Sequence, residues 1–521
     1  MIRPPKATAL LALVALLGAE APAEAGHSDG RRHLTVSPLR PAPAAVPVIP
    51  PAAPAATWQA RIDARLAALA ESAPAGVAAA PPSQTPVARH LDDLLASAPG
   101  VSIGVAVRDL HTGAPIFFHN ADQALNPASN NKLVTAIAAA ELLGRDYRFS
   151  TQVLREGRTL YIVGDGDPSL QVEDVAGLAA AAAAEAGDDT FDRIVIDDSF
   201  FSARRFGPGY DPAGPGFSYE APSGALSLQF NTVEIRVAPG AAEGPTHVSV
   251  SPECAHVRIV NEATTGRGGD LDISTWADGD QTVVHVRGRM RAGATPLEIR
   301  RRITDPGMYL GTTFAHRFAT MTDAEPLPVS RGEVPTSARV LVRHDSEPLT
   351  DVLRSALLYS NNFTTEQVLR TLGARRSGAP GDWDNGAAAL RAFWIAIGLD
   401  PSDLTLVNGS GYSHRGRVSP DALVRLLALT ARPGSDAAAV VASLPAPGEH
   451  GTLRRRLGMA RGRLRAKTGT MRGASALSGI ISRHEREAYG FSILVNGPIS
   501  TDRSRRLQDR IVVALVGELP G

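Results

Sequence analysis

The feature that most constrains the fold is a long interruption in the helical patterning. Between about 148 and 337 the chain carries short runs typical of β-strands, such as TLYIVGDGD and QTVVHVRGRM, separated by Gly, Pro and Asp turns. One Ala-rich helix, at 174–186, is the only helix expected there. The pattern therefore predicts a discontinuous domain formed by 86–147 and 338–521, with a β-rich module inserted at 148–337.

The two flanking parts mix helices with a few strands. VSIGVAVRDL and APIFFHN predict a β-hairpin, and GRLRAKTGT, SALSGIIS and AYGFSILVNG predict three strands near the C-terminus. The segments NPASNNKLVTAIAAAELLG, LTDVLRSALLYSNNFTTEQVLRTLGA and NGAAALRAFWIAIG are expected to be helical, as is the amphipathic segment DRSRRLQDRIVVALVGEL at the end.

The N-terminus reads as a secretory signal peptide over residues 1–25. Arg3 and Lys6 precede the apolar run ATALLALVALLG, and Ala23-Glu24-Ala25 offers a cleavage site. The chain is therefore expected in the periplasm, with an uncleaved anchor as the alternative. Residues 26–85 form a Pro/Ala-rich leader expected to be largely disordered, apart from one amphipathic helix at 57–72.

Composition excludes several classes of function. The formal net charge is zero, so neither a nucleic-acid partner nor an anionic membrane surface is expected. No segment after the signal is apolar enough for a stable membrane span in the mature chain. The single cysteine, Cys254, excludes an internal disulfide, and the thirteen histidines lack metal-ligand spacing, so we expect no metal and no cofactor. The oligomeric state is left open.

Lysine is nearly absent from this chain. Of 53 basic residues only three are lysine, at Lys6, Lys132 and Lys467, and the other fifty are arginine. An arginine guanidinium does not deprotonate in a protein, whereas a lysine amine can act as a base. Because export removes Lys6, the two remaining lysines mark positions where a titratable amine is needed.

Each lysine lies in a short motif. Ser129 stands three residues before Lys132 at the start of a predicted helix, where the two side chains share a face. The structural alternative is a helix-capping serine beside a solvated lysine. Lys467 opens Lys-Thr-Gly on a predicted strand, and the alternative there is a surface cation. Between them, Ser360-Asn361-Asn362 offers a hydroxyl and an amide, although this triplet alone more often marks a turn.

Ser-x-x-Lys, Ser-x-Asn and Lys-Thr-Gly, in this order, are the motifs of penicillin-binding proteins and class A β-lactamases. Over about residues 86–518 the chain resembles the low-molecular-mass penicillin-binding proteins that act as D-alanyl-D-alanine carboxypeptidases and endopeptidases. Supporting stretches include GDGDPSL, YEAPSGALSLQFNTVEI and LPAPGEHGTLRRRL. The long interval between the two motif serines matches the subgroup with a large insertion between the first two motifs. This resemblance implies an α/β (α+β) serine β-lactamase/transpeptidase-like domain, in which helices flank an antiparallel sheet, plus a helical subdomain.

The resemblance also implies a role for each motif residue. Ser129 would attack the carbonyl of a terminal D-Ala-D-Ala or of a D-alanyl cross-link, and Lys132 would take its proton. Ser360, supported by Asn362, would pass a proton to the leaving amine. Lys467 would keep Lys132 neutral by charge repulsion and attract the substrate carboxylate.

Substrate binding is expected along the third motif, at Thr468, Gly469 and Thr470. The strand edge there would receive an extended peptide, and the backbone N–H groups of Ser129 and Thr470 would form the oxyanion hole. The expected partners are peptidoglycan peptides and β-lactams.

Three positions depart from the family pattern, and two other functions compete. Asn408 stands where relatives usually have Asp, His414 replaces a frequent Arg, and the nearest acidic residue upstream of YEAP is Asp211. These differences leave open whether a diaminopimelate or a lysine stem peptide is preferred.

The competing functions are a β-lactamase or esterase, for which we find no motif that places a deacylating Glu, and a non-catalytic β-lactam-sensing wall protein.

Overall fold

The computed structural model describes residues 55–72, 86–96, 98, 100–483 and 486–519. The predicted signal peptide and most of the predicted leader lie outside these residues. Within the described part of the chain, no helix combines the length and the apolar character needed to cross a membrane.

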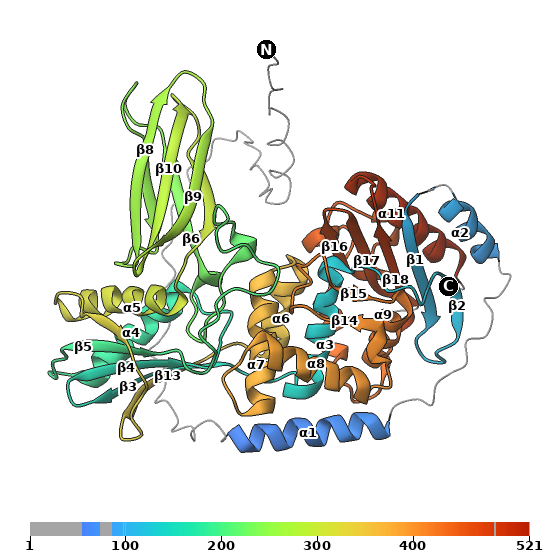
Figure 1. Ribbon diagram of the computed structural model, residues 1–521, viewed down its shortest axis with the longest axis horizontal. Coiled ribbons are helices and arrows are strands. Elements are labelled where there is room, and N and C mark those ends of the chain that lie inside the picture. The colour runs from blue at the N-terminus through green and yellow to red at the C-terminus, as the bar shows by residue number, and fades with distance from the viewer. Residues whose placement is uncertain (1–54, 73–85, 97, 99, 484–485, 520–521) are drawn as a thin grey trace, which may run out of the picture. The chain divides into compact units, whose positions relative to one another are not determined.

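Strands from the beginning and the end of the described chain form one five-stranded sheet. Its order is β16-β17-β18-β1-β2, and every neighbouring pair is antiparallel (Figure 1). The strands are β1 (Ser102–Asp109), β2 (Pro115–His119), β16 (Leu464–Met471), β17 (Ala474–Arg483) and β18 (Arg486–Asn496). This confirms the predicted hairpin and the three predicted C-terminal strands. Strand β16, which carries Lys-Thr-Gly, lies at an edge of the sheet.

Both faces of this sheet are covered by helices, which explains why β1 is apolar on both sides. Val105 and Val107 share a core cluster with Leu91 of α2 (Pro86–Ala96) and Ile511 of α11 (Thr501–Glu518). The alternate residue Ala106 points to the other face and packs on α9 (Pro420–Leu427). The terminal amphipathic helix predicted from the sequence is therefore α11, and its apolar side covers the sheet.

A group of helices packs beside the sheet around one large core. These helices are α3 (Asn131–Leu143), α6 (Leu349–Leu358), α7 (Asn362–Ser377), α8 (Trp383–Ala396) and α10 (Ala438–Ala442). Every residue of α3 is buried, including Lys132. An antiparallel sheet flanked by helices, with a helical subdomain, is the fold that was expected.

Helix α1 (Ala55–Glu71) confirms the helix predicted at 57–72. Its apolar side faces the helical core, where Ile62 and Leu69 are buried and Trp58 meets Tyr147 edge to face at 5.3 Å between ring centres. This portion of the predicted leader is therefore a helix that packs against the core, and the expectation of disorder does not apply to it.

Three further sheets and two α-helices lie between α3 and α6 along the chain (Figure 1). The first sheet has β3 (Ser150–Glu156), β4 (Thr159–Gly164), β5 (Arg193–Asp197), β12 (Val329–Arg331) and β13 (Arg339–Asp345). The second has β6 (Thr232–Ala238), β7 (His247–Ser251) and β11 (Leu297–Arg302), and the third has β8 (Val257–Gly266), β9 (Leu271–Asp278) and β10 (Gln281–Arg291). Because β13 pairs with β3, this sheet continues past the boundary expected at 337. A short ribbon of β14 (Leu404–Thr405) and β15 (Arg417–Val418) lies outside this region.

The sequence predicted only one helix in this region, α4 (Val172–Ala186), and missed α5 (Pro306–Thr322). Helix α5 begins at a recognisable signal, because Asp305 Oδ1 accepts from the backbone N–H of Met308 at 3.2 Å and a proline occupies the first turn. Glycines within α5 weakened the sequence pattern. Gly311 lets the helix approach β5, since an added Cβ would lie 2.8 Å from the side chain of Ile196.

Candidate active site

Ser129 lies in a tight 3-10 turn (Ala128–Asn130) that leads directly into α3. Ala128 has a positive φ of 45°, and the Oδ1 atom of Asn126 fixes the turn by accepting from the Ala128 N–H at 2.8 Å. The strain of this backbone needs support from neighbouring segments.

Two glycines from distant motifs provide that support. A Cβ atom added to Gly469 would lie 2.8 Å from the carbonyl oxygen of Pro127 and 3.0 Å from the nitrogen of Ser129. One added to Gly411 would lie 2.0 Å from the carbonyl oxygen of Ala128. The glycine of Lys-Thr-Gly therefore makes room for the turn that carries Ser129. Substrate binding at Gly469, expected together with Thr468 and Thr470, stays a prediction.

The amine of Lys132 is fully buried and has three partners. Its Nζ atom lies 2.7 Å from Asn362 Oδ1, 2.9 Å from the carbonyl oxygen of Ser410 and 3.1 Å from Ser129 Oγ. The amide oxygen and the carbonyl can only accept, so they bind two N–H groups. A neutral amine has two N–H groups and one lone pair, so the lone pair faces the Ser129 hydroxyl.

Burial is the main cause that lowers the pKa of Lys132, to about 7, and the negative charge of Glu366 opposes this shift. Desolvation is therefore the larger cause, and the expected repulsion by Lys467 stays a prediction for Lys132. Near neutral pH a substantial fraction of Lys132 is available as a base.

Ser360 occupies the break between α6 and α7, which the sequence pattern predicted as one helical run. Its φ is +61°, in the left-handed region, and Asn361 caps α7 by accepting from the Thr364 N–H at 3.2 Å. The Ser360 hydroxyl then lies 2.9 Å from the Nζ atom of Lys467.

Lys467 is also fully buried, and its Nζ atom lies 2.7 Å from the carbonyl oxygen of Thr468. Burial first, and then the charge of Lys132, lower the pKa of Lys467 well below its ordinary value. The two lysines are thus coupled, and the two steps in which they lose their protons belong to the pair and not to either amine alone.

The remaining motif residues lie on strand β16. Thr468 and Thr470 are half-buried on this edge strand, and Thr468 Oγ1 lies 2.7 Å from Thr452 Oγ1. The structure thereby brings together residues of all three motifs, which are separated by hundreds of positions in the chain.

An aromatic group next to Asn362 was not anticipated. The Nδ2 atom of Asn362 donates to the carbonyl oxygen of Tyr219 at 3.0 Å. The partly exposed Tyr219 ring stacks on Phe217 at 5.1 Å and meets Tyr412 edge to face at 5.6 Å. The segment YEAPSGALSLQF supported the resemblance, but no spacing indicated that its backbone would hold the amide of the second motif.

The three positions that depart from the family pattern differ in exposure. Asn408 is buried, and its Nδ2 atom donates to the carbonyl oxygens of Pro208 and Tyr412 at 2.9 and 3.0 Å. Its amide therefore holds a loop together and is not presented to solvent. His414 and Asp211 are exposed.

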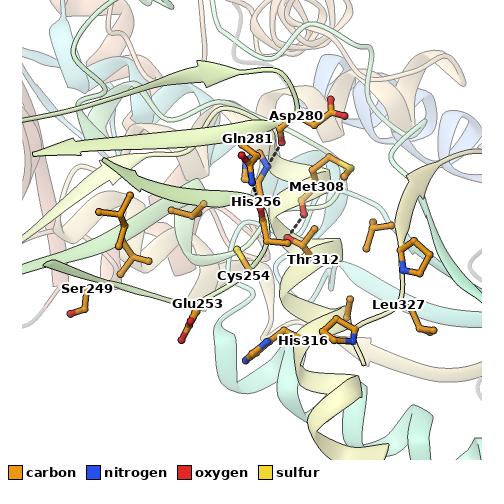
Figure 2. A pocket seen from close by; sticks show the side chains of 18 of the residues that line it. Ser249, Glu253, Cys254, His256, Asp280, Gln281, Met308, Thr312, His316 and Leu327 are labelled. Atoms are coloured by element: carbon orange, nitrogen blue, oxygen red, sulfur yellow. Dashed lines mark hydrogen bonds between the residues drawn. The ribbon is translucent and has the colours of Figure 1, made fainter. Parts of the chain in front are cut away.

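A cavity of about 820 Å³ lies between the loop after β7 and helix α5, and none of its lining residues belongs to the three motifs (Figure 2). His256 there has both ring nitrogens engaged, at 2.6 Å from the carbonyl oxygen of Asp280 and 2.9 Å from Thr282 Oγ1. Burial raises the pKa of the Cys254 thiol, which makes it a poor nucleophile. Within the described residues no group of acidic, histidine or cysteine side chains is arranged to hold a metal ion.

The fold and the pair formed by the half-buried Ser129 and the buried Lys132 define the class of serine peptidases that includes the penicillin-binding proteins. A family model described as the D-Ala-D-Ala carboxypeptidase 3 (S13) family matches residues 84–516. The chain belongs to this family and is a serine-type D-Ala-D-Ala peptidase, as the resemblance predicted.

The relatives agree with this assignment. The chain is similar to the D-alanyl-D-alanine carboxypeptidase of Actinomadura sp. (strain R39), with 33% identity over 442 residues, 80% of this chain and 81% of the relative. It is 26% identical over 483 residues to the carboxypeptidase DacB of Mycolicibacterium smegmatis, covering 88% of each. The crystal structure of penicillin binding protein 4 (dacB) from Haemophilus influenzae has the same fold, with a TM-score of 0.70 at 20% identity, covering 81% of this chain and 98% of that one.

Proposed function

We propose that this chain is a periplasmic carboxypeptidase and D-Ala endopeptidase that cleaves peptidoglycan stem peptides and cross-links through an acyl-enzyme on Ser129. The observation that carries this proposal is the orientation of Lys132. Its Nζ atom lies 3.1 Å from Ser129 Oγ, and two acceptors hold the N–H groups of the neutral amine, so its lone pair faces the serine hydroxyl. We also assign the chain to the subgroup with a large insertion between the first two motifs.

In the acylation step, Lys132 removes the proton of Ser129 while Oγ attacks the carbonyl carbon of the penultimate D-Ala. The C–O bond forms, and the carbonyl oxygen takes up negative charge. The N–H groups of Ser129 and Thr470 donate to this oxygen, because the first lies in the turn before α3 and the second lies on the edge strand β16.

Collapse of this intermediate breaks the peptide C–N bond and requires a proton on the leaving nitrogen. Ser360 donates that proton and recovers one from Lys467, whose Nζ atom is 2.9 Å away. A substrate carboxylate beside Lys467 favours the protonated form of this amine. Substrate binding therefore provides the proton that Lys467 passes to Ser360. Asn362 binds the substrate amide and holds Lys132 at 2.7 Å.

Water then attacks the acyl carbonyl carbon and gives a proton to Lys467 through Ser360. Lys132 returns its proton to Ser129 Oγ as the acyl C–O bond breaks. We propose that β-lactams acylate the same serine and remain bound for long periods, which disfavours the β-lactamase alternative. Glu366, which couples electrostatically to Lys132, has both carboxylate oxygens occupied by N–H and O–H donors, so it is not free to activate water. The Haemophilus influenzae relative has been crystallised in complex with a β-lactam.

The deciding experiment is digestion of purified muropeptides, with the products weighed by mass spectrometry. Loss of a terminal D-Ala identifies carboxypeptidase activity, and conversion of cross-linked dimers to monomers identifies endopeptidase activity. Ser129→Ala should remove both reactions and also abolish covalent labelling by a fluorescent penicillin. Labelling that survives this substitution would place the nucleophile elsewhere, and rapid release of hydrolysed penicillin by the wild type would favour the β-lactamase reading.

A further inference from the structure

The Gly409–Ser410 peptide contributes to the site although it belongs to none of the three motifs. The Ser410 carbonyl accepts from Lys132 Nζ at 2.9 Å and thereby fixes one of its N–H groups. This segment is neither helix nor strand. The direction of the Ser410 carbonyl therefore depends on the neighbouring side chains that hold the loop.

Glu366 is the side chain that holds the amide side of this loop. One of its oxygens accepts from the Ser410 N–H at 2.9 Å, and the other accepts from the Gly409 N–H at 3.0 Å. Glu366 is 1% exposed and lies one turn after Asn362 on α7. Residues four apart share a helix face, so α7 supplies both Asn362 and the support for Ser410.

The other two partners of this carboxylate are also donors. Tyr210 OH donates at 3.2 Å, and the indole N–H of Trp383 donates at 2.7 Å. A glutamine would place an NH₂ group against one of the two backbone N–H groups, because neither of them can accept. The site is therefore built for an ionised carboxylate.

Helix α3 holds the carbonyl side of the same loop. Thr135 Oγ1 donates to the carbonyl oxygen of Gly409 at 2.8 Å, and Asn131 Nδ2 donates to that of Asn408 at 2.9 Å. A Cβ at position 409 would lie 2.4 Å from the carbonyl oxygen of Thr365, so only glycine allows this approach to α7.

We propose that Glu366 is a positioning residue for acyl transfer, which holds the Gly409–Ser410 backbone so that the Ser410 carbonyl turns the lone pair of Lys132 toward Ser129. Its negative charge also acts on the buried amine of Lys132. This inference rests on the proposed function, in which Lys132 is the base.

The charge gives the proposal a distinctive signature. Glu366 raises the pKa of Lys132 against the effect of burial. The other charged or titratable groups around this pair are Lys467 on β16, Arg370 one turn further along α7, and Tyr210, beyond which lies Glu220. Removing the carboxylate lowers the pKa of Lys132, so the acid limb of the acylation rate moves to lower pH.

The test measures the second-order rate of acylation by a fluorescent penicillin from pH 5 to pH 9. Glu366→Gln should acylate about 10- to 100-fold more slowly at pH 8, because the base is misaligned. Its acid limb should move down by about one pH unit relative to the wild type. A normal rate with an unmoved limb would overturn the proposal.

Glu141→Gln is the matched control, because Glu141 is another buried, hydrogen-bonded glutamate, nine positions after Lys132 on α3. It should leave the acid limb in place. Should Glu366→Gln not fold, Glu366→Asp keeps the charge but is too short to bridge both backbone N–H groups. This variant should acylate more slowly at every pH with an unmoved limb, and a wild-type rate would refute the positioning role. A wild type that shows no Ser129-dependent labelling would instead reject the proposed function itself.

Discussion

Replacing Lys132 by Met tests the central physical claim, that the protein keeps an amine in a place where burial destabilises its charge. Methionine has a similar length and no charge, so Lys132→Met should fold while losing acylation. The informative quantity is how the free energy of unfolding of each protein changes with pH.

The magnitude follows from the shift in the pKa of Lys132, from 10.5 in the unfolded chain to about 7 in the folded protein. Between these two values the unfolded chain binds a proton that the folded protein does not, so stability rises with pH across this window. Linkage gives a penalty of about 4 kcal/mol at pH 7 that falls to about 2 kcal/mol at pH 9.

The difference in the free energy of unfolding between the wild type and Lys132→Met contains a second contribution. Met leaves Asn362 Oδ1 and the Ser410 carbonyl without their donor, which costs about 1–3 kcal/mol each. That loss does not depend on pH. The change in the difference between pH 7 and pH 9 therefore isolates the amine. Loss of the repulsion by Lys132 also raises the pKa of Lys467 in the variant. The free energy of unfolding of the variant therefore depends even less on pH.

The assay is chemical denaturation at pH 7, 8 and 9, followed by the fluorescence of Trp383 and Trp394, which are both buried in the helical core. The wild type should gain about 2 kcal/mol more than Lys132→Met over this range. Equal pH slopes for the two proteins would show that Lys132 keeps an ordinary pKa, and the argument for its role as a base would fail.

Two other substitutions follow from the same geometry. Lys132→Arg keeps the positive charge but cannot deprotonate, so hydrolysis of a D-Ala-D-Ala peptide should fall below a few per cent of the wild-type rate, and a higher residual rate would reject Lys132 as the base. Gly469→Ala places a Cβ 2.8 Å from the carbonyl oxygen of Pro127, so it should destabilise the protein by about 1–3 kcal/mol and slow penicillin labelling of Ser129. Gly458→Ala is the control, because an added Cβ there meets open space and the backbone is not in the left-handed region, and it should label at the wild-type rate.

Local patterns predicted much of the fold. The apolar run in VSIGVAVRDL and the three C-terminal apolar runs correctly gave four strands of the central sheet, because a strand covered on both faces keeps a short apolar run. The helix at 57–72 was also visible, although its place against the helical core was not. Helix α5 escaped notice because its glycines make a poor helical pattern, and packing against β5 compensates for them.

The break between α6 and α7 shows where local patterns fail. The expected helical run included Ser360-Asn361-Asn362, although this triplet more often marks a turn, and no local pattern specified that Ser360 adopts a left-handed conformation that costs free energy in isolation. Contacts from β16 and from the Tyr219 segment surround this turn, and both come from distant parts of the chain.

By itself the sequence determined which chemistry is available. Nearly every basic residue of this chain is arginine, yet positions 132 and 467 are lysine, and only an amine can lose a proton there. Tertiary structure decided how that amine is used. Burial sets the pKa of Lys132, and the carbonyl of Ser410 and the amide of Asn362 aim its lone pair at Ser129. Desolvation and hydrogen-bond direction depend on atoms that meet only after folding, so no local pattern in the chain specifies them.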